Sequence, residues 1–140
     1  MTVDVVYTAE STASGGGRTG HVTSAEGTID FDTSPPAPDS QGRVNPEMLF
    51  SAGYAACFLG ALRKQARVRE IDLADDATVT AQIGFGKHSE GGFGLTATLE
   101  GFMPGVDSTV ADELMAAAHQ NCPYSKATRG NIDVSLVAKT

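Results

Sequence analysis

The sequence has little positive charge, only two cysteines and no apolar run long enough to cross a membrane. Ten Lys and Arg residues stand against 17 Asp and Glu residues, which gives a formal net charge of −7. Binding to nucleic acid or to an anionic membrane relies on Lys and Arg, so this balance disfavours both kinds of partner. Small molecules and other proteins are the expected partners.

The longest uncharged run, Met48–Leu62, has 15 residues and lies between Glu47 and Arg63. A membrane-spanning helix needs about 20 apolar residues, so the run predicts a buried helix instead. The first ten residues include Asp4 and lack the apolar core of a signal peptide. We therefore expect a cytoplasmic protein, in which two cysteines are catalytic, redox-active or simply buried rather than a permanent disulfide.

Repeats, coiled-coil heptads and nucleotide-binding motifs are also missing. The stretch GGGR lacks the Lys-Ser/Thr ending of a phosphate-binding loop, and GFGKHSEGG lacks dinucleotide-binding spacing. Three scattered histidines and two distant cysteines make a weak ligand set, so no metal site is expected.

The length and the residue patterns predict one α+β domain over residues 1–140. Residues 1–32 are rich in Thr, Ser and Gly and predict β structure, with turns at Gly15–Gly17 and Ala25–Gly27. Three prolines make residues 32–43 a loop. The N-cap Asn45 and Pro46 then begin a long helix.

Residues 77–103 predict an antiparallel hairpin, because two strand-like runs flank the loop KHSEGG. A second helix follows from the N-cap Asp107 and ends at or just before Cys122, since Pro123 disfavours helical geometry there. Alternating apolar residues predict a strand in the last ten residues. The expected architecture is antiparallel sheet packed on two main helices.

Two cysteines are the first candidates for chemistry. Cys57 lies inside the first helix and Cys122 lies 65 residues later, at the end of the second. This spacing does not show that the sulfurs meet. From the residues alone, two buried, unreactive cysteines are the favoured explanation, because free cysteine is among the most buried residue types and reactivity needs a polarising environment that spacing does not show.

Arg18 and Glu47 are the next candidates. A guanidinium beside a thiol favours the nucleophilic thiolate, and the glycines before Arg18 would let the backbone approach another element. A solvated arginine on a turn, and a carboxylate that complements a helix dipole, are equally simple explanations. Glu47 could hold Arg18 in a bidentate pair, but about 15 Å of straight helix separates it from Cys57. Contact would need the long arginine, a helix bend or a second chain.

His119 lies three residues before Cys122 and could help to deprotonate that thiol. A histidine on a helix face that makes one structural hydrogen bond is the interpretation we favour.

The stretches NPEMLFSAGYAACFLGAL and AHQNCPYSKATRGNIDV together resemble the organic hydroperoxide resistance (Ohr) branch of the OsmC/Ohr family. YTAESTASGGGRTGH, GFGL and PGVD fit the same branch, so the resemblance covers residues 7–137. The loop Thr33–Arg43 departs from the family pattern.

The resemblance implies a thiol-dependent peroxidase with no bound metal or flavin, built as an intertwined homodimer. By motif position, Cys57 would be the peroxidatic cysteine and Cys122 the resolving one, while Arg18 would activate Cys57 and Glu47 would hold Arg18. It also implies recycling by a dihydrolipoyl dithiol, from dihydrolipoamide or lipoylated proteins. Apolar residues near Cys57 would bind the organic group of the hydroperoxide: Phe50, Tyr54 and Phe58.

Two other functions remain open. The chain could be a dithiol–disulfide oxidoreductase that acts on proteins. It could also be a redox sensor or lipid-binding protein in which the cysteines have no catalytic part.

Overall fold

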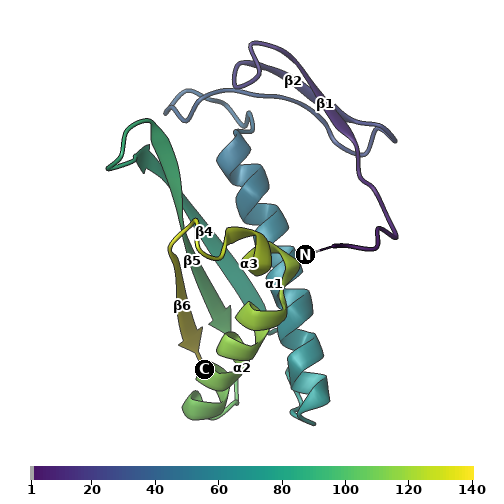
Figure 1. Cartoon of the computed structure of the whole chain (residues 1–140), viewed down its shortest axis with the longest axis vertical. Coiled ribbons are helices and arrows are strands. Elements are labelled where there is room, and N and C mark those ends of the chain that lie inside the picture. Colours follow the sequence, from purple (N-terminus) through teal and green to yellow (C-terminus); the bar gives the residue numbers. More distant parts are fainter. Residues whose placement is uncertain (1) are drawn as a thin grey trace. The chain divides into compact units, whose positions relative to one another are not determined.

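The computed structural model describes residues 2–140 and divides the chain into two compact units. The N-terminal unit is Met1–Leu49 and the C-terminal unit is Phe50–Thr140. Figure 1 shows the elements of both units, with α1 beginning in the first and continuing into the second. The prediction of one domain over residues 1–140 stays a prediction.

A three-stranded antiparallel sheet forms the N-terminal unit, with β1 (Ser11–Gly15), β2 (Gly20–Ser24) and β3 (Asp30–Asp32) in that order. The turn between β1 and β2 depends on glycine. Gly17 has φ of +73°, and a Cβ on Gly20 would overlap the carbonyl oxygen of Ser14. The predicted β structure and the turn predicted at Gly15–Gly17 are therefore confirmed, and the close backbone approach explains why glycine is needed there.

The proline-containing segment after β3 has no regular structure apart from one bridge, in which Thr33 pairs with Val44. Helix α1 (Pro46–Val68) follows directly. Asn45 caps it, because its side-chain oxygen accepts the backbone N–H of Met48 at 2.9 Å. The predicted loop and helix start are both confirmed.

Helix α1 buries one face in the C-terminal unit and leaves the opposite face exposed. The buried side chains recur every four residues: Tyr54, Phe58, Leu62 and Ala66. Small residues on the other side, among them Ala56 and Gly60, are exposed in this chain. A helix that is apolar on most sides is thus covered on only one of them.

The second sheet contains β4 (Thr78–Lys87), β5 (Phe93–Phe102) and β6 (Val134–Lys139). Strands β4 and β5 form the predicted antiparallel hairpin. Strand β6 pairs with β5 in parallel, so the expectation of a wholly antiparallel sheet is wrong. The connection explains the difference, because a helical crossover between β5 and β6 returns the chain to the end of the sheet where β5 began.

Helix α2 (Ser108–Asn121) lies in this crossover and starts as predicted, with the Asp107 carboxylate accepting two backbone N–H groups. It ends at Asn121, and Cys122 has an extended backbone, as the following proline requires. A six-residue helix that was not predicted, α3 (Pro123–Thr128), begins at once. Cys122 therefore ends one helix and precedes the next.

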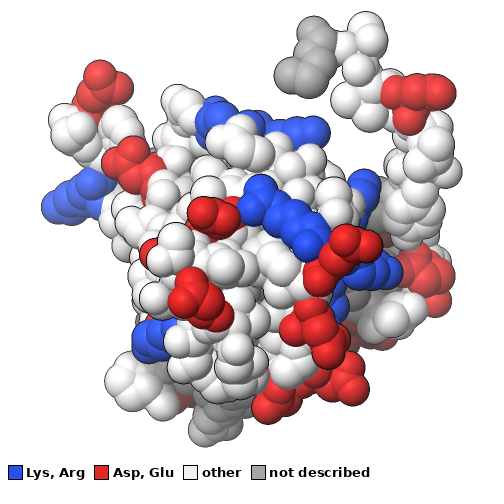
Figure 2. Space-filling view, turned by 90° about the horizontal axis from the view of Figure 1, so that it is seen from below, with Lys and Arg blue, Asp and Glu red and all other residues white. Residues whose placement is uncertain are grey.

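Helices α1 and α2 pack on one face of the β4–β5–β6 sheet, where Ala97 and Leu99 of β5 and Met103, just after that strand, join the core. Within residues 2–140, no helix combines the length and the hydropathy that a membrane crossing needs. Figure 2 shows acidic and basic side chains interspersed over one face of the molecule.

Candidate active site

The structure brings the two cysteines together. Cys57 projects from α1, Cys122 lies at the α2–α3 junction, and their sulfur atoms are 3.5 Å apart without a covalent bond. Cys122 is completely buried, whereas Cys57 is half-buried. A disulfide needs a separation of about 2.05 Å, so a movement of about 1.5 Å would join the sulfurs.

Opposing influences act on the Cys57 thiol. Burial raises its pKa most, and the neighbouring Cys122 raises it further. A hydrogen bond from the backbone N–H of Tyr124 acts in the opposite direction, because it favours the thiolate. The net effect is a raised pKa, and none of the groups responsible is a cation. Within its own unit, Cys57 is held mainly as the thiol.

Aromatic rings pack next to this pair. Tyr54 makes edge contacts with Phe50 and Phe58, at centroid distances of 6.0 and 6.5 Å. The Tyr124 ring lies 5.8 Å from that of Tyr54 and rests on α1 where Gly53 leaves room; a Cβ there would come within 3.0 Å of the Tyr124 hydroxyl. The small residue in α1 thus allows α3 to approach closely.

A chain of hydrogen bonds ties α1, α2 and α3 together. The Tyr54 hydroxyl lies 2.9 Å from the Ser125 hydroxyl and 3.1 Å from that of Thr128. The Ser125 hydroxyl lies 2.9 Å from Nδ1 of His119. Because all three hydroxyl residues are buried, each of these bonds satisfies a group that water does not reach.

Each hydroxyl in this hydrogen-bonded series can donate only one proton, and this fixes which group donates and which accepts. The Thr128 hydroxyl donates to the carbonyl oxygen of Ser125, so it accepts the proton of Tyr54. Tyr54 then accepts from the Ser125 hydroxyl, which accepts from Nδ1–H of His119. Burial, together with the charge of Arg129, lowers the pKa of His119 and favours the neutral ring. The favoured interpretation of His119, one structural hydrogen bond, is confirmed.

Arg18 and Glu47 form a bidentate ion pair within the N-terminal unit. The Arg18 Nη2–Glu47 Oε1 distance is 2.6 Å and the Nη1–Oε2 distance is 3.2 Å. Hydrogen bonding lowers the pKa of the Glu47 carboxyl and raises the pKa of the guanidinium. Glu47 is mostly buried, and about half of the Arg18 side chain is exposed. The guanidinium therefore contacts Glu47 on one side and remains accessible on the other.

Comparison with known proteins gives the same family throughout. The family model described as OsmC-like protein matches residues 38–137. The chain belongs to the OsmC-like family. Organic hydroperoxide resistance protein OhrB of Bacillus subtilis is 47% identical over 137 residues, which cover 96% of this chain and 98% of that protein. An organic hydroperoxide resistance protein of Xanthomonas axonopodis is 43% identical, with 94% of each chain covered.

Solved structures agree with these relatives. The crystal structure of OhrB superposes with a TM-score of 0.89 and covers 96% of this chain and 100% of its own. An organic hydroperoxide resistance protein from Elizabethkingia anophelis, with thiocyanate bound, is 44% identical, has a TM-score of 0.89 and covers 99% of both chains. The resemblance to the Ohr branch is confirmed, and so is the α+β fold class.

The residues predicted for this OsmC-like chain fall into three groups. Cys57 and Cys122 are in contact. Arg18 and Glu47 are paired with each other, as predicted, while their role toward Cys57 stays a prediction. The proposed peroxide contacts differ in exposure, because Tyr54 and Phe58 are completely buried and Phe50 is partly exposed. A peroxide could touch the buried two only after a rearrangement, and their substrate role also stays a prediction.

Sequence reasoning missed the buried hydroxyl chain of Ser125 and Thr128. Their only signal was two small polar residues after Cys122, and the partner Tyr54 lies 71 residues away from Ser125. Such a distant pairing leaves no local pattern.

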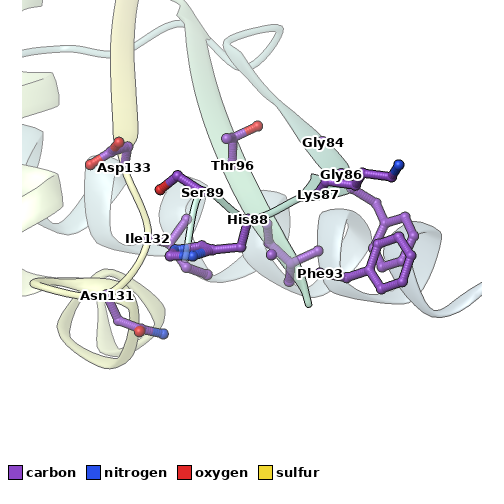
Figure 3. A pocket seen from close by; sticks show the side chains of 13 residues that line it. Gly84, Gly86, Lys87, His88, Ser89, Phe93, Thr96, Asn131, Ile132 and Asp133 are labelled. Atoms are coloured by element: carbon purple, nitrogen blue, oxygen red, sulfur yellow. The ribbon is translucent and has the colours of Figure 1, made fainter. Parts of the chain in front are cut away.

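A cleft in the C-terminal unit of this OsmC-like chain lies between the tip of the β4–β5 hairpin and residues 131–133, as Figure 3 shows. His88 and Asp133 are among its polar residues, and Phe85 and Phe93, which also line it, stack with their ring centroids 4.9 Å apart. Neither cysteine lines it. Across residues 2–140, no three His, Cys, Asp or Glu side chains are grouped as metal ligands would be.

Proposed function

We propose that this chain is a cysteine-based peroxidase that reduces organic hydroperoxides to alcohols. The observation that carries the proposal is the unbonded Cys57–Cys122 pair, whose sulfurs lie 3.5 Å apart. Relatives that match nearly the whole chain are named organic hydroperoxide resistance proteins, and this supports the peroxide as substrate.

The chemistry balances without a bound cofactor. The Cys57 thiolate attacks one peroxide oxygen, the O–O bond breaks, and the alcohol leaves after taking up a proton. Cys57 becomes a sulfenic acid. The Cys122 thiol then attacks that sulfur, water leaves, and a disulfide forms. A dithiol reductant, which we propose to be dihydrolipoamide or a lipoylated protein, reopens the disulfide by exchange.

Arg18 has a defined part in this scheme. Burial raises the pKa of Cys57, so the groups around it favour the unreactive thiol. We propose that the Arg18 guanidinium, held by Glu47, offsets this effect by favouring the thiolate.

We also propose an oligomeric state and a cellular compartment for this peroxidase. An exposed apolar face on α1 supports a homodimer, in which a second chain covers that face. A reducing compartment such as the cytoplasm suits a cycle that ends in disulfide reduction.

The test measures peroxide consumption by the purified chain with dihydrolipoamide and cumene hydroperoxide. Cys57→Ser removes the nucleophile and should abolish turnover. Cys122→Ser is the matched variant: it should still form the Cys57 sulfenic acid, detected by a sulfenate-specific reagent, yet stop after one turnover and over-oxidise.

The outcome separates the alternatives. Turnover that survives Cys57→Ser would refute the peroxidase. Dithiol–disulfide exchange with a protein substrate, without peroxide consumption, would favour an oxidoreductase. Oxidation of Cys57 in wild-type protein that never cycles would favour a sensor. Equal rates with hydrogen peroxide would remove the proposed preference for an organic group.

A further inference from the structure

Thr33 is a buried polar residue that the proposed chemistry does not use. Its side chain reaches the turn between β1 and β2. The hydroxyl donates to the carbonyl oxygen of Gly17 at 2.5 Å and accepts the N–H of Gly20 at 2.8 Å. These two glycines directly bracket the residues Arg18 and Thr19. The hydroxyl of Thr33, a residue that is only 5% exposed, therefore bridges the two ends of the turn that carries the arginine.

The main chain around Thr33 leads toward Glu47. The Ser34 N–H donates to the Val44 carbonyl at 3.1 Å, and the Val44 N–H donates to the Asp32 carbonyl at 3.3 Å. Val44 precedes Asn45, the residue that caps α1, and Glu47 lies in the first turn of that helix. The Thr33 segment is thus bonded to the Arg18 turn on one side and to the start of α1 on the other.

The two members of the ion pair differ in how firmly their backbones are held. Glu47 is in a capped helix, where the backbone is fixed. Arg18 is on a turn that contains Gly17 and directly follows Gly15, both with positive φ, and glycine restricts its own backbone least. Two backbone hydrogen bonds lie within the turn, from Gly16 N–H to the Thr19 carbonyl at 3.2 Å and from Gly17 N–H to the Ser14 carbonyl at 3.4 Å. The Thr33 hydroxyl adds a hydrogen bond from outside the turn on each side of Arg18 and Thr19.

We propose that Thr33 is a positioning residue that acts through Arg18: its hydroxyl fixes the arginine turn so that the guanidinium stays paired with Glu47 in one position. This inference rests on the proposed function, in which Arg18 favours the Cys57 thiolate. It also gives a role to the first residue of the loop that departs from the family pattern.

Three substitutions separate positioning from general stability. Thr33→Val has nearly the same shape and removes both hydrogen bonds, whereas Thr33→Ser keeps the hydroxyl. Ser24→Ala is the matched control, because Ser24 is also buried in this sheet and its hydroxyl accepts the Ile29 N–H at 3.0 Å, at the opposite end of β2. Each variant is assayed for its unfolding temperature, for the pH dependence of Cys57 alkylation, and for kcat/KM with cumene hydroperoxide.

Thr33→Val should raise the pKa of Cys57 toward the value that Cys57 has in the Arg18→Ala variant. It should also lower kcat/KM on the order of tenfold or more, because a displaced activating group loses much of its effect. Thr33→Ser should restore both to near wild-type values. Ser24→Ala should lower the unfolding temperature without moving the pKa. A double variant, Arg18→Ala with Thr33→Val, should react no more slowly than Arg18→Ala alone, since Thr33 acts through the arginine.

Different results would contradict the Thr33 inference and the role proposed for Arg18. A folded Thr33→Val protein with a wild-type Cys57 pKa and rate overturns the positioning role, while a slower Arg18→Ala leaves the proposed function standing. Additive losses in the double variant also overturn it. If Arg18→Ala itself leaves the thiol pKa and the rate unchanged, the activating role proposed for Arg18 fails, and the Thr33 inference fails with it.

Discussion

The Tyr54 hydroxyl is the middle of the buried hydrogen-bonded chain that joins α1 to α3. Tyr54→Phe keeps the ring and removes the hydroxyl, so Ser125 and Thr128 each lose a partner where water is excluded. We expect a loss of about 1–3 kcal/mol in the free energy of unfolding, which is the usual cost of leaving a buried polar group unsatisfied. Urea denaturation measures it.

Tyr124→Phe is the control for this substitution. Its ring belongs to the same aromatic cluster but is 42% exposed, so removing its hydroxyl should change stability by less than about 0.5 kcal/mol. Equal losses of unfolding free energy in the two variants would show that the buried hydrogen bonds of Tyr54 contribute no more to stability than the exposed hydroxyl of Tyr124.

The structural role of a residue was predictable where it depends only on neighbours in the sequence. Asn45 and Asp107 could be recognised as caps, because a cap depends on the next few residues. The proximity of Cys57 and Cys122 could not, since it depends on how two helices pack 65 residues apart. The Arg18–Glu47 pair lies between these cases: the charges suggested it, and only the fold shows the bidentate contact.

At the scale of elements, strands β2 and β3 are joined by a histidine between two carboxylates. Nδ1 of His21 lies 2.7 Å from Asp32 and Nε2 lies 2.7 Å from Asp30, so both ring nitrogens carry protons when both bonds are made. The hydrogen bonds that His21 donates to Asp32 and then to Asp30 raise its pKa. The pKa of Asp32 is lowered, chiefly by His21 and less by Arg43.

The pH window follows from these directions. The raised pKa of His21 gives stability that is fully present below 6.5, its unperturbed value, and is lost as pH rises through the folded pKa. The lowered pKa of Asp32 gives stability that is present above 3.8 and is lost as pH falls through the folded pKa. The β2–β3 pairing should therefore be firmest between pH 3.8 and 6.5.

Amide hydrogen exchange of β2 and β3, corrected for intrinsic exchange rates, measures this effect. In wild-type protein, protection should decline as pH rises from 6 to 8. In His21→Gln, which cannot titrate, the decline should disappear. The same decline in both proteins would mean that another group is responsible.

One element, α3, and the direction of another, β6, escaped prediction. Helix α3 has only six residues, too few to show helical periodicity, although Pro123 suits a first helical position. The direction of β6 depends on which end of the sheet the α2–α3 crossover reaches. Apolar alternation predicted the strand and carried no information about its direction.

At the scale of the whole molecule, several apolar side chains remain uncovered. Val6 is 95% and Val68 is 68% exposed, and the small-residue face of α1 that includes Ala56 is also open. Exposed apolar surface of this extent favours association. We expect a homodimer of twice 14.5 kDa in sedimentation or light scattering at micromolar concentration.

A charge on the open face of α1 tests which surface associates. Ala56→Glu places a carboxylate at an exposed position of the protomer, so the protomer should stay folded and the mass should fall to that of one chain. Lys64→Glu is the control, because it adds a carboxylate at an exposed, already charged position of the same helix. Dimers that persist in Ala56→Glu would place the interface elsewhere.

The 65-residue separation of two touching sulfurs has a thermodynamic consequence for the reductant. A disulfide across that span would restrict the unfolded chain and stabilise the fold by about 4 kcal/mol from loop-closure entropy alone. Because folding and disulfide reduction form one thermodynamic cycle, the same free energy makes the disulfide harder to reduce in the folded chain than in the unfolded chain. When a monothiol opens the disulfide, the released protein thiol can re-form it at a high effective concentration. A dithiol opposes this reversal, because its second thiol closes a ring with an effective concentration of its own.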